Sequence, residues 1–370
     1  MSLRLRLLRW GHRLPLHRLP FHLSVALSSW GRRHLWKLLA ERVPATVTTP
    51  PPHAARHLWG LCFRAPLFNA AGMFKYGEGY ELAYRQGAGA YLAGTATDLP
   101  RRGRISAGIC QPFASYPRSR AALNALGLPN PGHSALARRI ARLPRYPGFP
   151  IGVSVAVDPE LPPEEALPRL LGGLRQYVDA GVDFIELNES CPNVPHNASW
   201  RAVEFRLRWL AEHFLQRRER FVPVVVKVSL DLSPEMLTVL LHLLLYLGYD
   251  GITLGNTSTA YEALLPAIAP EEQPAYSHFW QRFGGGISGA PLRERRRELI
   301  RLASAWLAQS RPEREFHLIA AGGILCPDDL TAALADGASL AQWYTGYLFA
   351  LAEHGDALYR HMYAGIPADP

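Results

Sequence analysis

The chain has 370 residues, of which 48% are hydrophobic and 19% are charged, a balance typical of a globular protein rather than a disordered one. The formal net charge is +9, but eight basic residues and no acidic residue precede Glu41. The remainder is almost neutral, which argues against a broad nucleic-acid-binding surface. The four cysteines are widely spaced without a CxxC pair, which disfavours a metal site or a disulfide framework and fits a reducing compartment.

The first 45 residues form a basic segment in which leucine and tryptophan alternate with arginine. Pro15 and Pro20 interrupt it, so the pattern predicts two or three short amphipathic helices. Such helices favour an anionic membrane surface, and we expect a membrane-binding arm over residues 1–45. A helical cap on the body, a cleaved targeting peptide and a disordered tail are the alternatives. No window approaches about 18 apolar residues without a charge, so no membrane-spanning helix is expected.

Residues 46–370 contain short apolar runs that alternate with helical stretches, and we expect them to form one domain. Strands that alternate with helices pair in parallel through crossover connections, and eight such units close into a (β/α)8 TIM barrel. The predicted fold class is therefore α/β. The eight runs are residues 67–72, 90–95, 150–157, 183–188, 223–228, 251–255, 316–321 and 340–344.

Periodic apolar residues predict helices between several of these runs. The intervals 96–149 and 258–315 are longer than ordinary connections in such a barrel, so they should carry additional or functional structure. The predicted helices cover residues 163–179, 199–216, 233–247, 293–309 and 327–335.

The fourth run ends in polar residues, and in this barrel function collects at the carboxyl ends of the strands. Asn188 and Asn193 can each donate and accept hydrogen bonds, so together they can bind a flat heterocycle with carbonyl and N–H groups. Cys191 lies between them and can act as an acid, a base or a nucleophile. An ordinary strand-to-helix turn with polar caps is the alternative interpretation.

Lys227 interrupts a valine-rich run whose two faces are both expected to be covered, so it needs an anionic partner. It can reach a carboxylate at the rim, form a Schiff base with a carbonyl substrate, or donate to an electron-rich cofactor ring. Two glycine segments, 284–289 and 321–324, precede and follow the seventh run, where barrels commonly bind phosphate. Asn124 lies in the long loop after the second run and is either a turn residue or a substrate contact.

Five ordered motifs together resemble the dihydroorotate dehydrogenase family, which uses FMN to oxidise dihydroorotate to orotate in pyrimidine (UMP) biosynthesis. The similarity covers roughly residues 40–350. The motifs are Asn-Glu-Ser-Cys-Pro-Asn at 188–193, the first-strand segments 60–67 and 70–78, Asn-Ala-Leu-Gly-Leu-Pro-Asn at 124–130, Gly-Gly-Ile-Ser-Gly-Ala-Pro-Leu at 285–292, and Tyr-Thr-Gly at 344–346.

The resemblance implies a role for individual residues. Cys191 is implied as the base that removes the C5 proton while a hydride leaves C6. The residues implied to bind the substrate are Lys75, Asn124, Ala125, Leu126, Gly127, Leu128, Asn188, Asn193, Asn256 and Thr257. The residues implied to bind FMN are Ala71, Gly72, Met73, Phe74, Lys75, Thr95, Ser154, Asn188, Lys227, Gly255, Gly289, Gly323, Tyr344 and Thr345.

The resemblance also implies a location and an electron acceptor. The basic arm and the placement of Lys75 resemble the branch that lies peripherally on the cytoplasmic face of the inner membrane and reduces a quinone. Cysteine as the base is typical of the soluble branches. The sequence also differs from the pattern of the membrane branch at the 98–105 loop, at Ser154 and at His196-Asn197. The alternatives are a soluble acceptor, another dihydropyrimidine as substrate, or a Schiff-base lyase or aldolase that uses Lys227.

Overall fold

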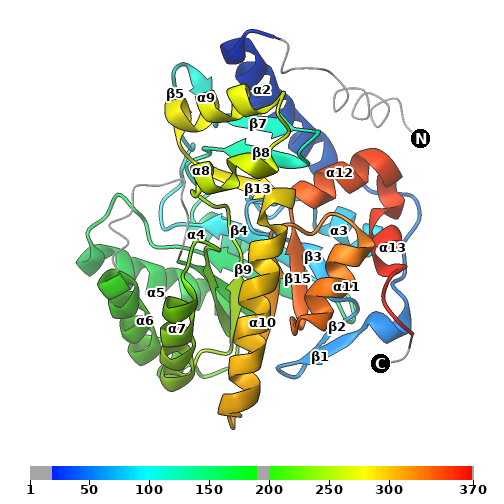
Figure 1. Ribbon diagram of the computed structural model, residues 1–370. Coiled ribbons are helices and arrows are strands. Elements are labelled where there is room, and N and C mark those ends of the chain that lie inside the picture. The colour runs from blue at the N-terminus through cyan, green and yellow to red at the C-terminus, as the bar shows by residue number, and fades with distance from the viewer. Residues whose placement is uncertain (1–18, 190–199, 369–370) are drawn as a thin grey trace.

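Eight parallel strands form a barrel at the centre of the computed structural model, which describes residues 19–189 and 200–368 (Figure 1). All eight apolar runs of the sequence form these strands, which confirms the (β/α)8 class. Their order around the barrel is β3 (Leu67–Asn69), β15 (Leu340–Trp343), β14 (His317–Ala321), β12 (Gly251–Leu254), β11 (Val224–Val228), β10 (Phe184–Asn188), β9 (Ile151–Val155) and β4 (Tyr91–Ala96).

The short strand β3 and strand β4 close the ring partly through a side chain. The amide of Asn69 donates to the Leu92 carbonyl (2.7 Å) and accepts from the Leu92 N–H (3.2 Å), in place of a backbone ladder. Beyond β3, Gly72 N–H donates to the Gly94 carbonyl at 2.7 Å. These bonds satisfy buried polar groups that would otherwise be costly at the seam.

Helices surround the barrel and cover the outer face of each strand with apolar side chains. The predicted helices 163–179 and 327–335 have the bounds found in the structure, and the other three differ by a few residues at their ends. The surrounding helices are α3 (Tyr80–Gln86), α4 (His133–Ile140), α5 (Pro163–Asp179), α6 (Trp200–His213), α7 (Pro234–Leu247), α10 (Arg293–Ser310), α11 (Pro327–Ala335), α12 (Thr345–His354) and α13 (Leu358–Tyr363).

The barrel interior has an apolar layer at the amino ends of the strands and a polar layer above it. Because alternate residues of a strand share one face, Phe184 and Glu186 both point inward, as do Val225 and Lys227. The hairpin of β1 (Arg56–Leu58) and β2 (Leu61–Phe63) closes the apolar end, where Trp59 and Phe63 join the inner cluster. Access to the interior therefore lies at the opposite end.

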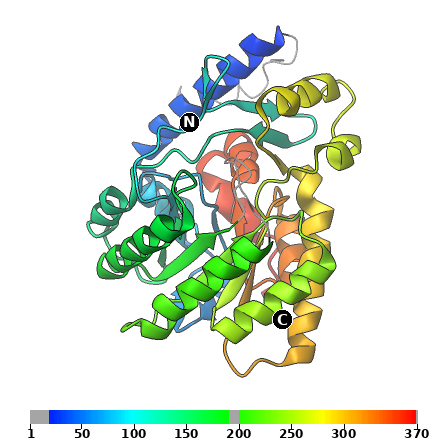
Figure 2. The same ribbon diagram turned by 90° about the vertical axis from the view of Figure 1, so that its left-hand side faces the viewer.

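A cap covers that opposite end and is built from the two long intervals noted in the sequence (Figures 1 and 2). Its three-stranded antiparallel sheet joins the loop after β4 to the chain before β14, with the order β13-β8-β7. The glycine segment 284–289 is therefore largely a strand rather than a loop. The cap contains β5 (Ile105–Ser106), β6 (Ile109–Cys110), β7 (Phe113–Tyr116), β8 (Ala121–Asn124), β13 (Gly286–Gly289), α8 (Tyr261–Leu264) and α9 (Gln273–Phe283).

Helix α2 (Phe21–Ala40) lies across this cap as one continuous helix that begins directly after Pro20, where the sequence predicts a break. The other helices predicted before Pro20 lie mostly outside the described residues. Pro20 precedes its first turn, where a proline is tolerated. One face is buried in the core and includes Val25, Trp36 and Leu39. Among the described residues, no helix is long and apolar enough to cross a bilayer.

Helices α4 and α5 pack through a buried histidine. The ring of His133 is 1% exposed, and its Nδ1 lies 3.1 Å from the Tyr177 hydroxyl. A Cβ atom at Gly173 would lie 2.3 Å from this ring, so only glycine leaves room for it. Burial lowers the pKa of His133 to about 4, because a charged imidazolium is poorly solvated there.

The depressed pKa of His133 predicts an acid-dependent loss of stability. The unfolded chain binds a proton near pH 6.5 and the native imidazole near pH 4, so stability falls as the pH drops between these values. The expected loss from this group is roughly 3 kcal/mol. Chemical denaturation of the wild type and of His133→Asn across pH 4–7.5 measures it, and equal pH dependence in both proteins would contradict it.

Candidate active site

A cavity opens at the carboxyl ends of the barrel strands, beneath the cap, and occupies about 1060 Å³ including the space open to solvent. Seven of the eight barrel strands, or the segments that follow them, contribute to its wall. The predicted site residues that line it are Ala71, Gly72, Lys75, Thr95, Asn124, Leu126, Leu128, Asn188, Lys227, Gly255, Asn256, Thr257, Gly289, Gly323, Tyr344 and Thr345.

Several predicted site residues do not line this cavity. Met73 and Phe74 are buried in the core, as is Ala125. Gly127 packs against the backbone of Arg104. Ser154 lies behind Thr95, with the two hydroxyl oxygens 3.0 Å apart. Cys191 and Asn193 lie outside the described residues, so their roles stay predictions.

Amide side chains form a connected polar wall on one side of the cavity. Asn256 Nδ2 donates to Asn188 Oδ1 at 3.0 Å, and Asn188 Nδ2 donates to Thr95 Oγ1 at 3.0 Å. This chain fixes the orientation of both amides. The hydroxyl of Thr257 is buried and has no hydrogen-bond partner among the described residues. A bound ligand would satisfy it, as buried polar groups normally are.

Lys227 lies on the floor of the cavity and is 3% exposed. Its Nζ donates to Gln342 Oε1 at 2.8 Å and lies 3.5 Å from a carboxylate oxygen of Glu186. The partner is thus inside the barrel, and not at the rim as one interpretation of the sequence had it. The sequence analysis gave no role to Glu186 or Gln342. Each lies two residues before a predicted site residue at the end of its strand, Asn188 or Tyr344, and so points to the same face one layer deeper in the barrel.

The opposite wall of the cavity is suited to a phosphate group. It combines the loop after β14, at Gly322 and Gly323, with the first turn of α12, at Thr345 and Gly346. Backbone N–H groups at a helix start and in a glycine loop attract anions, and barrels commonly bind phosphate here. Glycine at position 346 is required, because a Cβ atom there would lie 1.9 Å from the Ile324 carbonyl oxygen.

Charged and glycine residues complete the site near β3. Lys75 lines the cavity and is 8% exposed. Burial raises the pKa of the nearby Glu78 carboxyl, while backbone hydrogen bonds and the charge of Lys75 oppose that rise. Gly72 has a φ of 88°, and a Cβ atom there would have only Lys75 Cε nearby, at 3.9 Å. The backbone at Gly72 is therefore open to a flat ring system.

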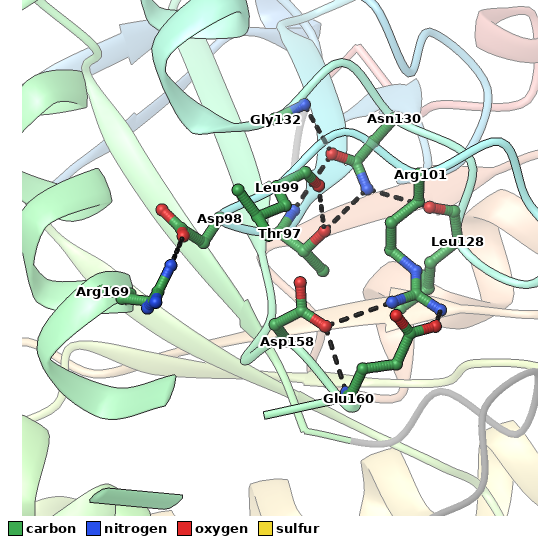
Figure 3. A network of polar contacts seen from close by, with 10 residues as sticks. All are labelled: Thr97, Asp98, Leu99, Arg101, Leu128, Asn130, Gly132, Asp158, Glu160 and Arg169. Atoms are coloured by element: carbon green, nitrogen blue, oxygen red, sulfur yellow. Dashed lines mark hydrogen bonds and ion pairs between the residues drawn. The ribbon is translucent and has the colours of Figure 1, made fainter. Parts of the chain in front are cut away.

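The long loop after β4 is fixed beside the cavity by a polar network (Figure 3). The amide of Asn130 accepts from the N–H groups of Thr97 and Gly132, and donates to the Thr97 hydroxyl and the Leu128 carbonyl. Arg101 pairs with Asp158 at 3.1 Å and with Glu160 at 2.8 Å, which joins this loop to the one after β9. The network supports the segment that carries Leu126, Leu128 and Pro129 on the cavity wall.

Replacing Asn130 by alanine should loosen this wall. All four hydrogen bonds of the buried amide are lost, and the N–H groups of Thr97 and Gly132 lose their acceptor. We expect about a tenfold rise in KM for the substrate, with a smaller change in kcat. Steady-state kinetics measure this, with Thr97→Ser, which keeps the hydroxyl, as the matched control. An unchanged KM would show that the network does not support binding.

The fold and the cavity define a class, namely (β/α)8 barrel proteins with a deep polar cavity at the carboxyl ends of the strands. Residues 53–362 match the family model described as dihydroorotate dehydrogenase. The chain is 34% identical over 302 residues to dihydroorotate dehydrogenase (quinone) of Synechococcus sp. strain JA-2-3B'a(2-13), across 80% of this chain and 76% of that protein. It is 33% identical over 342 residues to the protein of that name from Mycolicibacterium paratuberculosis, across 90% and 82%.

The chain therefore belongs to the dihydroorotate dehydrogenase family, whose members are flavin-dependent. The fold agrees with the crystal structure of DHODH in complex with ferulenol from Eimeria tenella. That comparison gives a TM-score of 0.76 at 19% identity, and covers 97% of this chain and 93% of the other.

Proposed function

We propose that this protein oxidises (S)-dihydroorotate to orotate with FMN and passes the electrons to a quinone at a membrane surface, in pyrimidine biosynthesis. The observation that carries the proposal is one cavity that joins a phosphate-binding end, a buried lysine and a set of oriented amides. Each part matches one part of the reactants: the FMN phosphate, the flavin ring and the pyrimidine ring.

The polar wall is suited to hold the substrate. Asn124, Asn188 and Asn256 offer the paired donors and acceptors that a uracil-like ring requires, together with the Thr257 hydroxyl, which has no partner in the described part of the chain. Lys75 provides a positive charge for the substrate carboxylate. Cys191 is proposed as the base for the C5 proton. The substrate then loses one proton and one hydride, so two electrons leave it for each orotate formed.

The floor and the far wall fit FMN. Lys227 would face the electron-rich edge of the flavin, and Gly72 and Gly255 would lie against the ring. Gly323, Tyr344 and Thr345 would hold the phosphate and the ribityl chain, together with Gly289. When bound, FMN accepts the hydride from C6 of the substrate. The chain's own residues orient the two rings and exclude water from the space between them.

Helix α2 supports the assignment of residues 1–45 as the membrane and quinone arm. Its outer face carries a stripe of exposed apolar residues: Leu23 (46%), Leu27 (42%), Trp30 (55%) and Leu38 (40%). Such a stripe suits the interface of a bilayer, which fits a peripheral protein on the cytoplasmic face of the inner membrane. The inner face reaches the cavity wall, because Trp36 Nε1 donates to the Tyr344 hydroxyl at 3.0 Å.

The exposed stripe of α2 gives a direct test of membrane binding. Changing Leu27 and Trp30 together to glutamate should reduce binding to anionic liposomes at least tenfold, since it removes apolar area and adds negative charge. Cosedimentation measures the binding, and reduction of FMN by dihydroorotate serves as the control for a folded active site. Unchanged binding would place the membrane contact elsewhere.

The visible spectrum of the purified protein tests the reaction itself. We expect flavin bands that bleach when dihydroorotate is added without oxygen and return when a quinone is added. Bands that do not bleach would point to another dihydropyrimidine as the substrate, and bands that return only with a soluble acceptor would remove the quinone. Absence of flavin after reconstitution with FMN would overturn the proposal. The alternative of a Schiff-base lyase is disfavoured, because Lys227 Nζ is held by Gln342 Oε1 and Glu186 on the cavity floor.

A further inference from the structure

Glu186 is a buried carboxylate directly behind the cavity floor. It has no exposed surface, whereas its neighbours Lys227 and Gln342 both line the cavity. An isolated charge at such a place is costly, so its partners determine what it does. The nearest cation among the described residues is Lys227, at 3.5 Å from Oε1.

The hydrogen bonds around Glu186 are arranged asymmetrically. Its Oε2 accepts from Gln342 Nε2 at 2.6 Å and from Thr253 Oγ1 at 3.1 Å. Its Oε1 has no hydrogen bond among the described residues and faces Lys227. The carboxylate is therefore fixed by two neutral donors, and its charge acts on Lys227 across a short gap.

Gln342 connects the anion to the cation. Its Oε1 accepts from Lys227 Nζ at 2.8 Å while its Nε2 donates to Glu186. Only one orientation of the amide serves both charges, so Glu186 orients Gln342 and Gln342 in turn positions the ammonium group. Glu186 thus influences both the position of the Lys227 ammonium group and the net charge of the cavity floor.

We propose that Glu186 is a positioning residue that holds Lys227 in place and offsets part of its charge, and that it thereby lowers the reduction potential of the flavin. The inference rests on the proposed binding of FMN above Lys227. A reduced flavin carries more negative charge than an oxidised one, so a positive floor favours reduction. In a buried site of low dielectric constant, removing the compensating carboxylate should strengthen that effect.

The test compares midpoint potentials of FMN-loaded variants, measured by equilibration with reference dyes. Glu186→Gln keeps the shape and removes the charge, and should favour reduced over oxidised flavin at least tenfold, a rise of about 30 mV for a two-electron couple. Thr253→Val removes one hydrogen bond and no charge, so it should stay within threefold of the wild type. Glu186→Asp keeps the charge and should rescue the potential.

A second pair of variants covers the case in which Glu186→Gln does not fold. Lys227→Met should lower the potential, and Lys227→Met with Glu186→Leu should recover part of that loss, because both charges are then removed. Equal potentials for this pair, or no rise in a folded Glu186→Gln, would overturn the inference. Failure of the wild type to bind FMN would instead overturn the proposed function.

Discussion

Substitution of Cys191 by alanine is expected to slow the reduction of bound FMN by dihydroorotate at least about 10²-fold, the usual scale for loss of a general base. The oriented amides Asn188 and Asn256 remain in this variant, so substrate binding should change much less than the rate. Stopped-flow measurement of flavin bleaching under anaerobic conditions separates the two quantities.

Cys191→Ser is the matched control for this experiment, because it keeps a group that can accept a proton. It should retain more activity than the alanine variant, with a dependence on pH that differs from that of the thiol. Near-normal flavin reduction in Cys191→Ala would remove this residue from the mechanism and leave the C5 proton without an assigned base.

Removal of residues 1–40 is expected to destabilise the whole protein. This deletion takes away Val25, Trp36 and Leu39, which are buried in the main core. Burial of each such side chain contributes about 1.5–3 kcal/mol, so the loss is roughly 5 kcal/mol or more, a large part of the stability of an ordinary domain.

Thermal unfolding of the truncated protein and of the full chain measures this loss. The truncated protein should melt far below the full chain or fail to fold. The deletion also removes the hydrogen bond between Ser29 Oγ and the Phe113 N–H, and Phe113 lines the cavity. Equal melting temperatures would show that α2 is an independent appendage.

The regular parts of the fold could be predicted from the sequence because their signals are local. The eight apolar runs and the helices 163–179 and 327–335 depend on periodicity within single segments. The small sheet of the cap could not be predicted, since β8 and β13 pair across a long stretch of chain and β13 is made largely of glycine and small residues. Helix α2 continues through Gly31 because tertiary packing on the cap overrides weak local propensity.

Part of the site could also be predicted from the sequence, namely the residues at the ends of the strands. Lys227, Asn188 and Asn256 end or follow apolar strands, and the barrel brings such positions together. The partner of Lys227 was missed, because the register pairs Lys227 with Asn188 and Glu186 with Val225. The contact between Lys227 and Glu186 is made diagonally by their side chains on the inner face, which only the folded structure shows. Met73, Phe74 and Ala125 belong to the sequence motifs of the site, yet their side chains are buried in the core behind it. A motif alone does not distinguish residues that line the cavity from residues that support its wall.

The sealed amino end of the barrel has a practical consequence. Trp59 and Phe63 close that end, so a ligand can reach the cavity only from the capped face. The β1–β2 hairpin is consequently a site where a fluorophore or an immobilisation tag can be attached at the end of the barrel opposite the cavity entrance. A protein tethered there would present its capped face, with the exposed stripe of α2, outward to a supported bilayer.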